Sequence, residues 1–264
     1  MFGFEMMMSS PIFFWSIAAL AVFSVALSKS GFGGALGAMS APILLFVLPP
    51  KLAIGVLLPL FLVTDFWVVY MWRRYLDRRL VIIMCGFGLL GQFLGWALFD
   101  YLSDEALTAI IGVVALTTAL AYVRKTFFSK KESSEDIVKR TVRRIWSRAP
   151  LWCGLSGVSS FVSLSGGIPA QIFLLPHGLV RQAFVATMSV YFLVINLAKL
   201  PLYIDLGLFT STGMQISLWL LPVIPFGVVV GKWLNTRISD DLFYHISHLA
   251  LFLMGLKLLS DAFS

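Results

Sequence analysis

The chain has 264 residues, of which 59% are hydrophobic and only 12% are charged, and it carries a net charge of +7. A water-soluble domain carries roughly 25% charged residues, so this deficit excludes a soluble globular protein and requires a surface that faces lipid. The positive charge does not indicate nucleic-acid binding, because much of it lies in one polar segment, 124–148, between two hydrophobic halves. Such a loop is typical of the cytoplasmic side of a membrane protein, with lipid-headgroup binding as an alternative reason for the charge.

Apolar runs long enough to cross a bilayer recur along the chain. The uncharged segments 80–99, 106–123 and 206–231 each reach the roughly 18–20 residues that a membrane helix needs, and they lack the strict alternation of barrel strands. We therefore expect an all-α integral membrane protein with about 8–10 membrane helices. The expected elements are 10–28, 32–48, 52–72, 80–99 and 105–123 in the first half, and 149–164, 167–178, 183–203, 213–232 and 242–261 in the second.

The two halves resemble one another in a series of short matches that keep their order. The matching segments are 37–44 with 166–173, 51–53 with 181–183, 91–95 with 227–231, and 103–104 with 239–240. Ordered matches of this kind are the signature of an internal repeat. The sequence therefore predicts a first membrane repeat at 1–123, a basic cytoplasmic linker at 124–148 and a second membrane repeat at 149–264.

The distribution of charge predicts that these repeats have opposite orientations. Arginines within 73–79 mark the loop after the third element as cytoplasmic, whereas the equivalent loop, 204–212, contains no basic residue. Conversely, the loop 100–105 contains no basic residue, whereas its counterpart contains Lys232 and Arg237. Equivalent loops therefore lie on opposite sides of the membrane, which predicts inverted repeats of five elements, with both termini outside the cytoplasm.

The second element of each half is expected to be short or re-entrant. Segment 167–178 is only about 12 residues long, or about 18 Å of helix, and cannot span a bilayer alone. Short elements at matching places in two halves mark the binding site of many transporters.

Gly- and Ser-rich turns, 28–34 and 163–169, stand where the first and second elements of each half meet. A half-helix that begins at such a turn directs unpaired N–H groups and its positive end inward, which attracts anions. The alternative is that these small residues allow tight helix packing, which is how we interpret the glycines within 91–95 and 227–231. The candidate substrate-binding residues of the turns are Ser30, Gly31, Gly33, Gly34, Ser163, Ser165, Gly166 and Gly167.

Ionisable and amide side chains within the expected membrane elements give further candidates, because burying such groups is costly and usually functional. Asp65 lies in the third element, and Asn196 lies near the equivalent place in the eighth, with Lys199 almost one turn further along. We expect Lys29, Gln171, Asn196 and Lys199 to bind an anion, and Asp65 to carry a coupling proton. The alternatives are that Lys199 extends outward to the lipid headgroups, that Lys29 lies at the cytoplasmic boundary, and that Asp65 pairs with an arginine.

No pattern in the sequence indicates a metal, a cofactor or an enzyme. Cys85 and Cys153 lie within apolar runs and are interpreted as packing residues. His245 and His248 have helical spacing, but no carboxylate or cysteine completes a metal site. No nucleotide-binding loop and no paired catalytic side chains are visible, so we expect neither an ATPase nor a membrane-embedded enzyme.

Four segments of the chain resemble the sulfite exporter TauE/SafE family of membrane proteins. They are 30–42, 192–201, 221–231 and 255–259, and the resemblance covers nearly the whole chain. The long basic central loop departs from the family pattern, which bears on regulation or partner binding.

The resemblance implies a secondary transporter that exports sulfite or organosulfonates such as sulfoacetate across the cytoplasmic membrane. Its partners would be the small anion, the lipid bilayer and, as candidates, protons for coupling and a second copy in a homodimer. The alternatives are a transporter of a different small anion and a non-transporting membrane scaffold.

Overall fold

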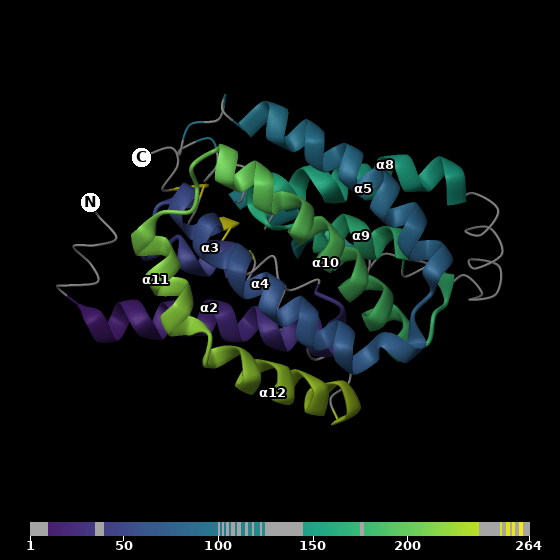
Figure 1. Cartoon of the computed structure of the whole chain (residues 1–264), viewed down its shortest axis with the longest axis horizontal. Coiled ribbons are helices and arrows are strands. Elements are labelled where there is room, and N and C mark those ends of the chain that lie inside the picture. Colours follow the sequence, from purple (N-terminus) through teal and green to yellow (C-terminus); the bar gives the residue numbers. More distant parts are fainter. Residues whose placement is uncertain are drawn as a thin grey trace.

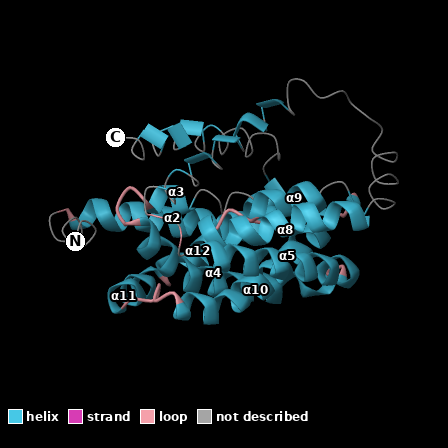
Figure 2. Cartoon of the chain, turned by 90° about the horizontal axis from the view of Figure 1, so that it is seen from above, coloured by secondary structure: helices cyan, strands magenta, loops and turns pink. Residues whose placement is uncertain are grey.

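The computed structural model describes residues 10–34, 40–99, 145–174 and 177–237, together with isolated positions between 101 and 124 and between 249 and 260. Every regular element in these stretches is a helix (Figures 1 and 2), which confirms the all-α class. In chain order these elements are α2 (Pro11–Phe32), α3 (Ser40–Leu44), α4 (Pro50–Trp72), the short 3-10 helix η2 (Arg73–Tyr75), α5 (Arg78–Phe99), α8 (Ile145–Ser163), α9 (Gly167–Leu174), α10 (Arg181–Asp205), α11 (Ser211–Leu220) and α12 (Val223–Arg237).

Four of these stretches are long and apolar enough to cross a membrane, and the bent pair α11–α12 makes a fifth if its two helices form one span. They are Pro11–Phe32, Pro50–Tyr75, Arg78–Phe99 and Arg181–Asp205. Large apolar side chains such as Phe93 on α5 and Phe226 on α12 are exposed, as expected of surfaces that face lipid. The chain is thus a multi-pass membrane protein, and the total of 8–10 helices stays a prediction.

Several expected features lie outside the described residues. These are the greater part of the elements 105–123 and 242–261, most of the linker 124–148, the repeat matches at 37–39, 104 and 239–240, and the histidines 245 and 248.

The structure corrects two of the expected helix boundaries. The segment 32–48 is not one element, because α2 continues through Phe32 and the described helix α3 covers only Ser40–Leu44. Helix α2 ends where Gly33 takes a left-handed conformation, with φ of 69°, and the amide of Gly34 donates to the Ser28 carbonyl.

The segment 213–232 is not one straight helix either, because α11 and α12 meet at a bend of 48°. Pro222 and Pro225 lack the N–H group that would continue the helical ladder through this point. The amides of Leu221 and Ile224 instead bond carbonyls three residues back. Helix α9, in the second element of the second half, has 8 residues. This is about 12 Å of helix, which is too short to span a bilayer, as the sequence predicts.

Helices α4 and α10, which occupy the same place in the two halves, pack against each other in opposite directions. At one end Gly55 of α4 lies against the carbonyl of Leu208, just beyond α10. At the other end Thr187 of α10 accepts a hydrogen bond from the amide of Asp77, just beyond α4. The two contacts lie at nearly equivalent places in the two halves, which is consistent with the prediction of inverted repeats.

Glycines form two further helix interfaces that correspond between the halves. A Cβ at Gly227 of α12 would lie 2.9 Å from the Phe23 carbonyl of α2, and Gly91 of α5 lies against the equivalent carbonyl, that of Gly154 in α8. One turn on, Gly231 meets Leu27 and Gly95 meets Val158. The interpretation of these glycines as packing positions is confirmed. In both interfaces the two helices run in the same direction.

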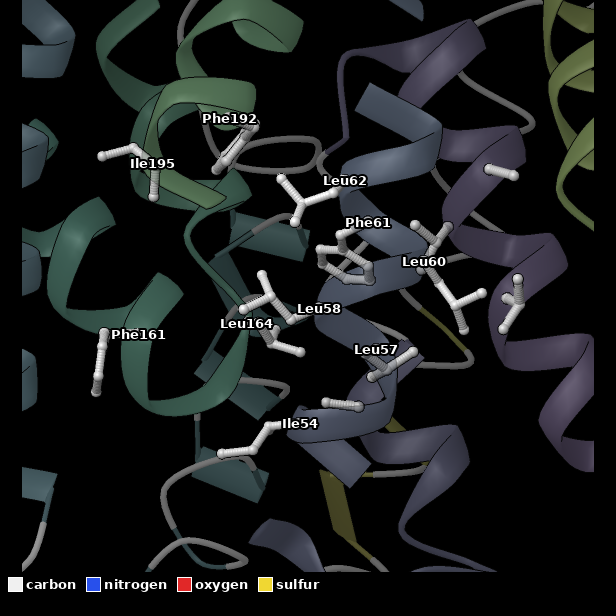
Figure 3. Packing of buried hydrophobic residues seen from close by; sticks show 14 of the residues in the cluster. Ile54, Leu57, Leu58, Leu60, Phe61, Leu62, Phe161, Leu164, Phe192 and Ile195 are labelled. Atoms are coloured by element: carbon white, nitrogen blue, oxygen red, sulfur yellow. The ribbon is translucent and has the colours of Figure 1, made fainter. Parts of the chain in front are cut away.

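The buried core contains many apolar side chains of α4, among them Ile54, Leu57 and Leu60. Figure 3 shows Leu58 and Phe61 of α4 in the same cluster as Phe161 of α8 and Ile195 of α10. This arrangement places the middle of α4 inside the protein, away from lipid. The polar residues Thr64 and Asp65 of α4 are buried there as well.

Candidate functional site

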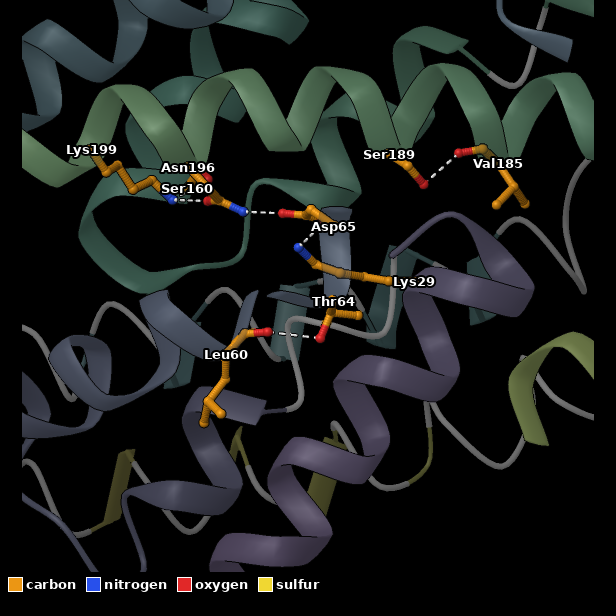
Figure 4. A network of polar contacts seen from close by, with 9 residues as sticks. All are labelled: Lys29, Leu60, Thr64, Asp65, Ser160, Val185, Ser189, Asn196 and Lys199. Carbon is orange, nitrogen blue, oxygen red and sulfur yellow. Dashed lines mark hydrogen bonds and ion pairs between the residues drawn. The ribbon is translucent and has the colours of Figure 1, made fainter. Parts of the chain in front are cut away.

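Five buried side chains form a continuous chain of polar contacts at the centre of the molecule (Figure 4). The ammonium of Lys29 donates to Asp65 Oδ1 at 2.6 Å, and Asn196 Nδ2 donates to Asp65 Oδ2 at 2.6 Å. The ammonium of Lys199 donates to Asn196 Oδ1 at 3.0 Å and to Ser160 Oγ at 2.8 Å. We call these five residues the polar centre.

The polar centre is removed from solvent and lipid. Lys199 and Asp65 are 0% exposed, and Lys29 is 4% exposed. The residues come from four helices, α2 and α4 in the first half and α8 and α10 in the second. Buried charges are stable only when paired and hydrogen-bonded, so the contacts among these side chains hold the four helices together as well as placing charge between them.

Local helix geometry explains why these side chains meet. Asn196 and Lys199 are three residues apart on α10 and therefore share one face of that helix. Lys29 lies in the last turn of α2, where the negative end of the helix dipole favours a cation. The rings of Phe61 and Phe192 enclose its ammonium, with centroids 4.4 Å and 5.5 Å away.

The two lysines of the polar centre differ in their partners. Lys29 forms an ion pair with Asp65, whereas both hydrogen bonds of Lys199 end on neutral oxygens, those of Ser160 and Asn196. An ammonium has three donors, and these two bonds use two of them. Within the part of the chain that the structure describes, Lys199 therefore has no carboxylate in contact.

The structure shows where the ionisable residues lie within the protein. Lys199 is buried and does not extend outward, and Lys29 is also buried. Asp65 pairs with a lysine and not with an arginine. The four residues Lys29, Asp65, Asn196 and Lys199, which the sequence placed in two separate halves, lie together.

The turn of the first half does not start a helix at the expected residues. Ser30 and Gly31 lie within α2, where the Ser30 hydroxyl donates to the Ala26 carbonyl and Gly31 packs against α12. Gly33 lies beside Phe184, and Gly34 lies beside the Lys29 side chain. The positive end of a helix is therefore absent from Ser30 and Gly31, and Gly34 is the member of this group next to the polar centre.

The turn of the second half does precede a helix, and it packs tightly. Ser163 ends α8, and the hydroxyls of Ser163 and Ser165 donate to nearby carbonyls. Gly166 lies against Ser160, with only 2.5 Å between a Cβ at this position and the Ser160 Cβ. Gly167 begins α9. A larger residue at 166 would therefore displace the serine that contacts Lys199.

Gln171 of α9 connects the short element to the first half. Its Nε2 donates to the carbonyl of Phe32, the last residue of α2, at 3.1 Å, and the side chain is buried. Gln171 thus ties α9 to α2, and its amide is directed to the end of that helix and not to the polar centre.

Sequence reasoning missed Ser160 and Gln92. Ser160 follows Lys29 by the same shift along the chain that relates Asn196 to Asp65, so the repeat alignment was the available signal. Gln92 of α5 is buried, and neither of its side-chain polar atoms has a hydrogen-bond partner among the described residues. The available signal for Gln92 was the one that indicated Gln171, an amide side chain within an expected membrane element.

No group of three or more histidine, cysteine, aspartate or glutamate side chains lies close enough to hold a metal ion in the described segments. The polar centre offers donors for an anion instead, since its lysines and amide present N–H groups within an apolar surround.

A bundle of apolar helices with charged side chains buried between them is typical of polytopic membrane transport proteins. Residues 18–258 match the family model described as Sulfite exporter TauE/SafE, and the chain belongs to this family. The resemblance drawn from the sequence is confirmed. Membership implies membrane export of sulfite or a related sulfur-containing anion. Neither a curated protein nor a solved structure gives a match to the chain.

Proposed function

We propose that the protein is a secondary transporter of the cytoplasmic membrane that exports small sulfur-containing anions, such as sulfite or sulfoacetate, through the polar centre. The observation that carries this proposal is the buried ammonium of Lys199, whose contacts are with neutral oxygens. A buried charge without a counterion is costly, and a bound anion supplies the missing one.

The chemistry of the polar centre suits an oxyanion. Lys199 has one N–H donor beyond its two hydrogen bonds, and an anion oxygen can accept from it. Hydrogen bonds between an ammonium and an oxyanion are short and strong, and their strength increases where water is excluded. Lys29 and Asn196 stand next in the same network, and we propose that they share in binding as the anion enters.

The arrangement of the helices supports alternating access around this site. Asp65 and Asn196 join α4 to α10 where the two equivalent helices cross in opposite directions. We propose that the repeats 1–123 and 149–264 rock about this crossing, exposing the site to each side of the membrane in turn. Asp65, as the carboxylate between the two lysines of the network, is the proposed carrier of a coupling proton.

The remaining candidates shape the site under this proposal. Gly34 and Gly166 lie beside Lys29 and Ser160, so we propose that they leave room next to the anion. We assign Ser30, Gly31, Gly33, Ser163, Ser165 and Gly167 to the helix ends that support it. Gln171 is proposed to hold α9 in place at the end of α2.

Flux of labelled sulfite into proteoliposomes tests the proposal. The parent protein should carry sulfite in a saturable way, and sulfoacetate should compete. Lys199→Met keeps the length of the side chain and removes its charge, and we expect flux to fall at least about tenfold. The matched control is Lys232→Met, which removes an exposed lysine of α12 and should leave flux unchanged.

Two results would contradict the assignment. Competition by phosphate or nitrate but not by sulfur anions would identify a transporter of a different anion. Absence of flux for every anion, from protein shown to be folded and inserted, would leave the non-transporting scaffold.

A further inference from the structure

We propose that Asp65 sets the charge of the anion that the polar centre accepts, so that a monoanion is carried alone and a dianion is carried only together with a proton on Asp65. This inference rests on the proposed function and deepens it. Under this proposal, the charge of the transported anion determines whether a proton is carried with it.

The ionisable groups of the polar centre do not balance in charge. Two ammonium groups, those of Lys29 and Lys199, face one carboxylate, that of Asp65, while Asn196 and Ser160 are neutral. One positive charge is therefore uncompensated when all three groups are ionised. Because the site is enclosed by apolar side chains, any state with a net charge is unfavourable, and a bound monoanion makes the site neutral.

No other charged side chain among the described residues changes this balance. Helices α3 and α11, which pack against α4, contain no titratable residue. In the other elements that contact α4, the charged groups away from the polar centre are exposed. These are Arg73 and Arg74 of η2, Arg181 and Asp205 of α10, and Lys232 and Arg237 of α12.

A dianion requires one more positive charge than the ionised polar centre provides. Protonation of the Asp65 carboxylate supplies it, since the proton neutralises the carboxylate and leaves both lysines unpaired. The site then carries two positive charges for a dianion, and it is again neutral once the anion has bound. The proton enters with the dianion on one side of the membrane and leaves the carboxylate on the other.

The hydrogen bonds give this coupling a direct path. Asp65 accepts from Lys29 with one oxygen and from Asn196 with the other, and Asn196 in turn accepts from Lys199. A proton on Asp65 replaces an acceptor with a donor, which releases Lys29 or reorients the Asn196 amide. Either change alters the donors that face an anion at Lys199.

Fluxes of two organosulfonates of fixed charge test the inference in proteoliposomes that hold the full chain at neutral pH, with the membrane voltage clamped. Methanesulfonate carries one negative charge, and sulfoacetate carries two. In the parent protein, an imposed pH gradient should drive sulfoacetate flux several-fold and leave methanesulfonate flux unchanged. Asp65→Asn, which fixes a neutral amide of the same shape, should raise the ratio of sulfoacetate to methanesulfonate flux at least about tenfold and remove the effect of the gradient.

The control variant is Asp205→Asn, which removes an exposed carboxylate at the end of α10 and should behave as the parent does. Sulfoacetate flux in the parent that ignores the gradient would overturn the inference, as would an equal response of both anions to Asp65→Asn. Either result leaves sulfite transport intact, so it is distinct from a failure of the proposed function, in which the parent carries no anion at all. The gradient measurement needs only the parent protein, so the inference stays testable if Asp65→Asn does not fold.

Discussion

On the α2–α4 side of the polar centre, a buried lysine meets a carboxylate, whereas on the α8–α10 side a second buried lysine meets only a hydroxyl and an amide oxygen. Lys29 corresponds to Ser160 and Asp65 to Asn196 along the chain, so the four residues occupy matching positions in the sequences of the two halves. At these matching positions the two sides differ in their charge. The similarity of the halves therefore accounts for the helix packing, whereas the proposed anion site depends on the positions at which the halves differ.

The largest effect should come from making the two sides alike in charge. Ser160→Asp places a carboxylate next to Lys199, which gives that lysine an internal counterion as Lys29 already has. We expect sulfite flux in proteoliposomes to fall at least about tenfold, because the substrate must then displace a tethered anion. Ser160→Asn has nearly the same volume without the charge and serves as the control. Equal flux in the two variants would show that the charge difference between the sides is not what attracts the anion.

A smaller effect tests the part of the scaffold that the halves share. Gly91→Ala forces a methyl group into the backbone of α8, and we expect a loss of about 1–3 kcal/mol in the free energy of unfolding. Gly227→Ala should cost a similar amount in the corresponding interface. Gly86→Ala, on the same helix α5 but with open space around it, should instead stabilise the protein by up to about 1 kcal/mol. Thermal unfolding in detergent measures the stability of all three variants. Unequal losses in the free energy of unfolding for Gly91→Ala and Gly227→Ala would argue against equivalent interfaces.

The smallest effect concerns Gln92, which occupies the place that Val228 holds in the other half. A buried amide without hydrogen-bond partners is unfavourable, so Gln92→Leu should raise the unfolding temperature slightly. Val228→Leu is the control for added bulk at the equivalent site. A fall in sulfite flux in Gln92→Leu, with stability preserved, would mean that Gln92 contacts the anion and that the two sides differ at a further position.

The sequence was sufficient to predict the residues whose burial is expensive. Asp65 and Lys199 stood out because charged groups are rare inside membrane helices, and Asn196 followed from the repeat. Ser160 did not stand out, because serines in membrane helices commonly donate to their own backbone, as Ser159 and Ser163 do in α8. Only the three-dimensional structure distinguishes the serine that reaches Lys199 from those that do not.

Helix boundaries were harder to predict for a physical reason. Gly and Ser end helices in water, where solvent competes for the backbone, but lipid offers no such competitor, so α2 continues through Ser30 and Gly31. The helix ends at Gly33, whose positive φ cannot be read from composition. The prolines at 222 and 225 were visible, but whether a membrane helix bends at proline depends on the neighbours that satisfy the freed carbonyls.

The pairing of α2 with α12 and of α5 with α8 has a consequence for how the protein is made. Each of these helices finds its partner in the opposite half of the chain, so neither half has a complete set of interfaces by itself. Helix α2 must therefore wait in the bilayer until α12, which is synthesised much later, has been inserted. Assembly of the described helices includes an interlocking step, in which α8 and α12 pack against helices that entered the membrane before them.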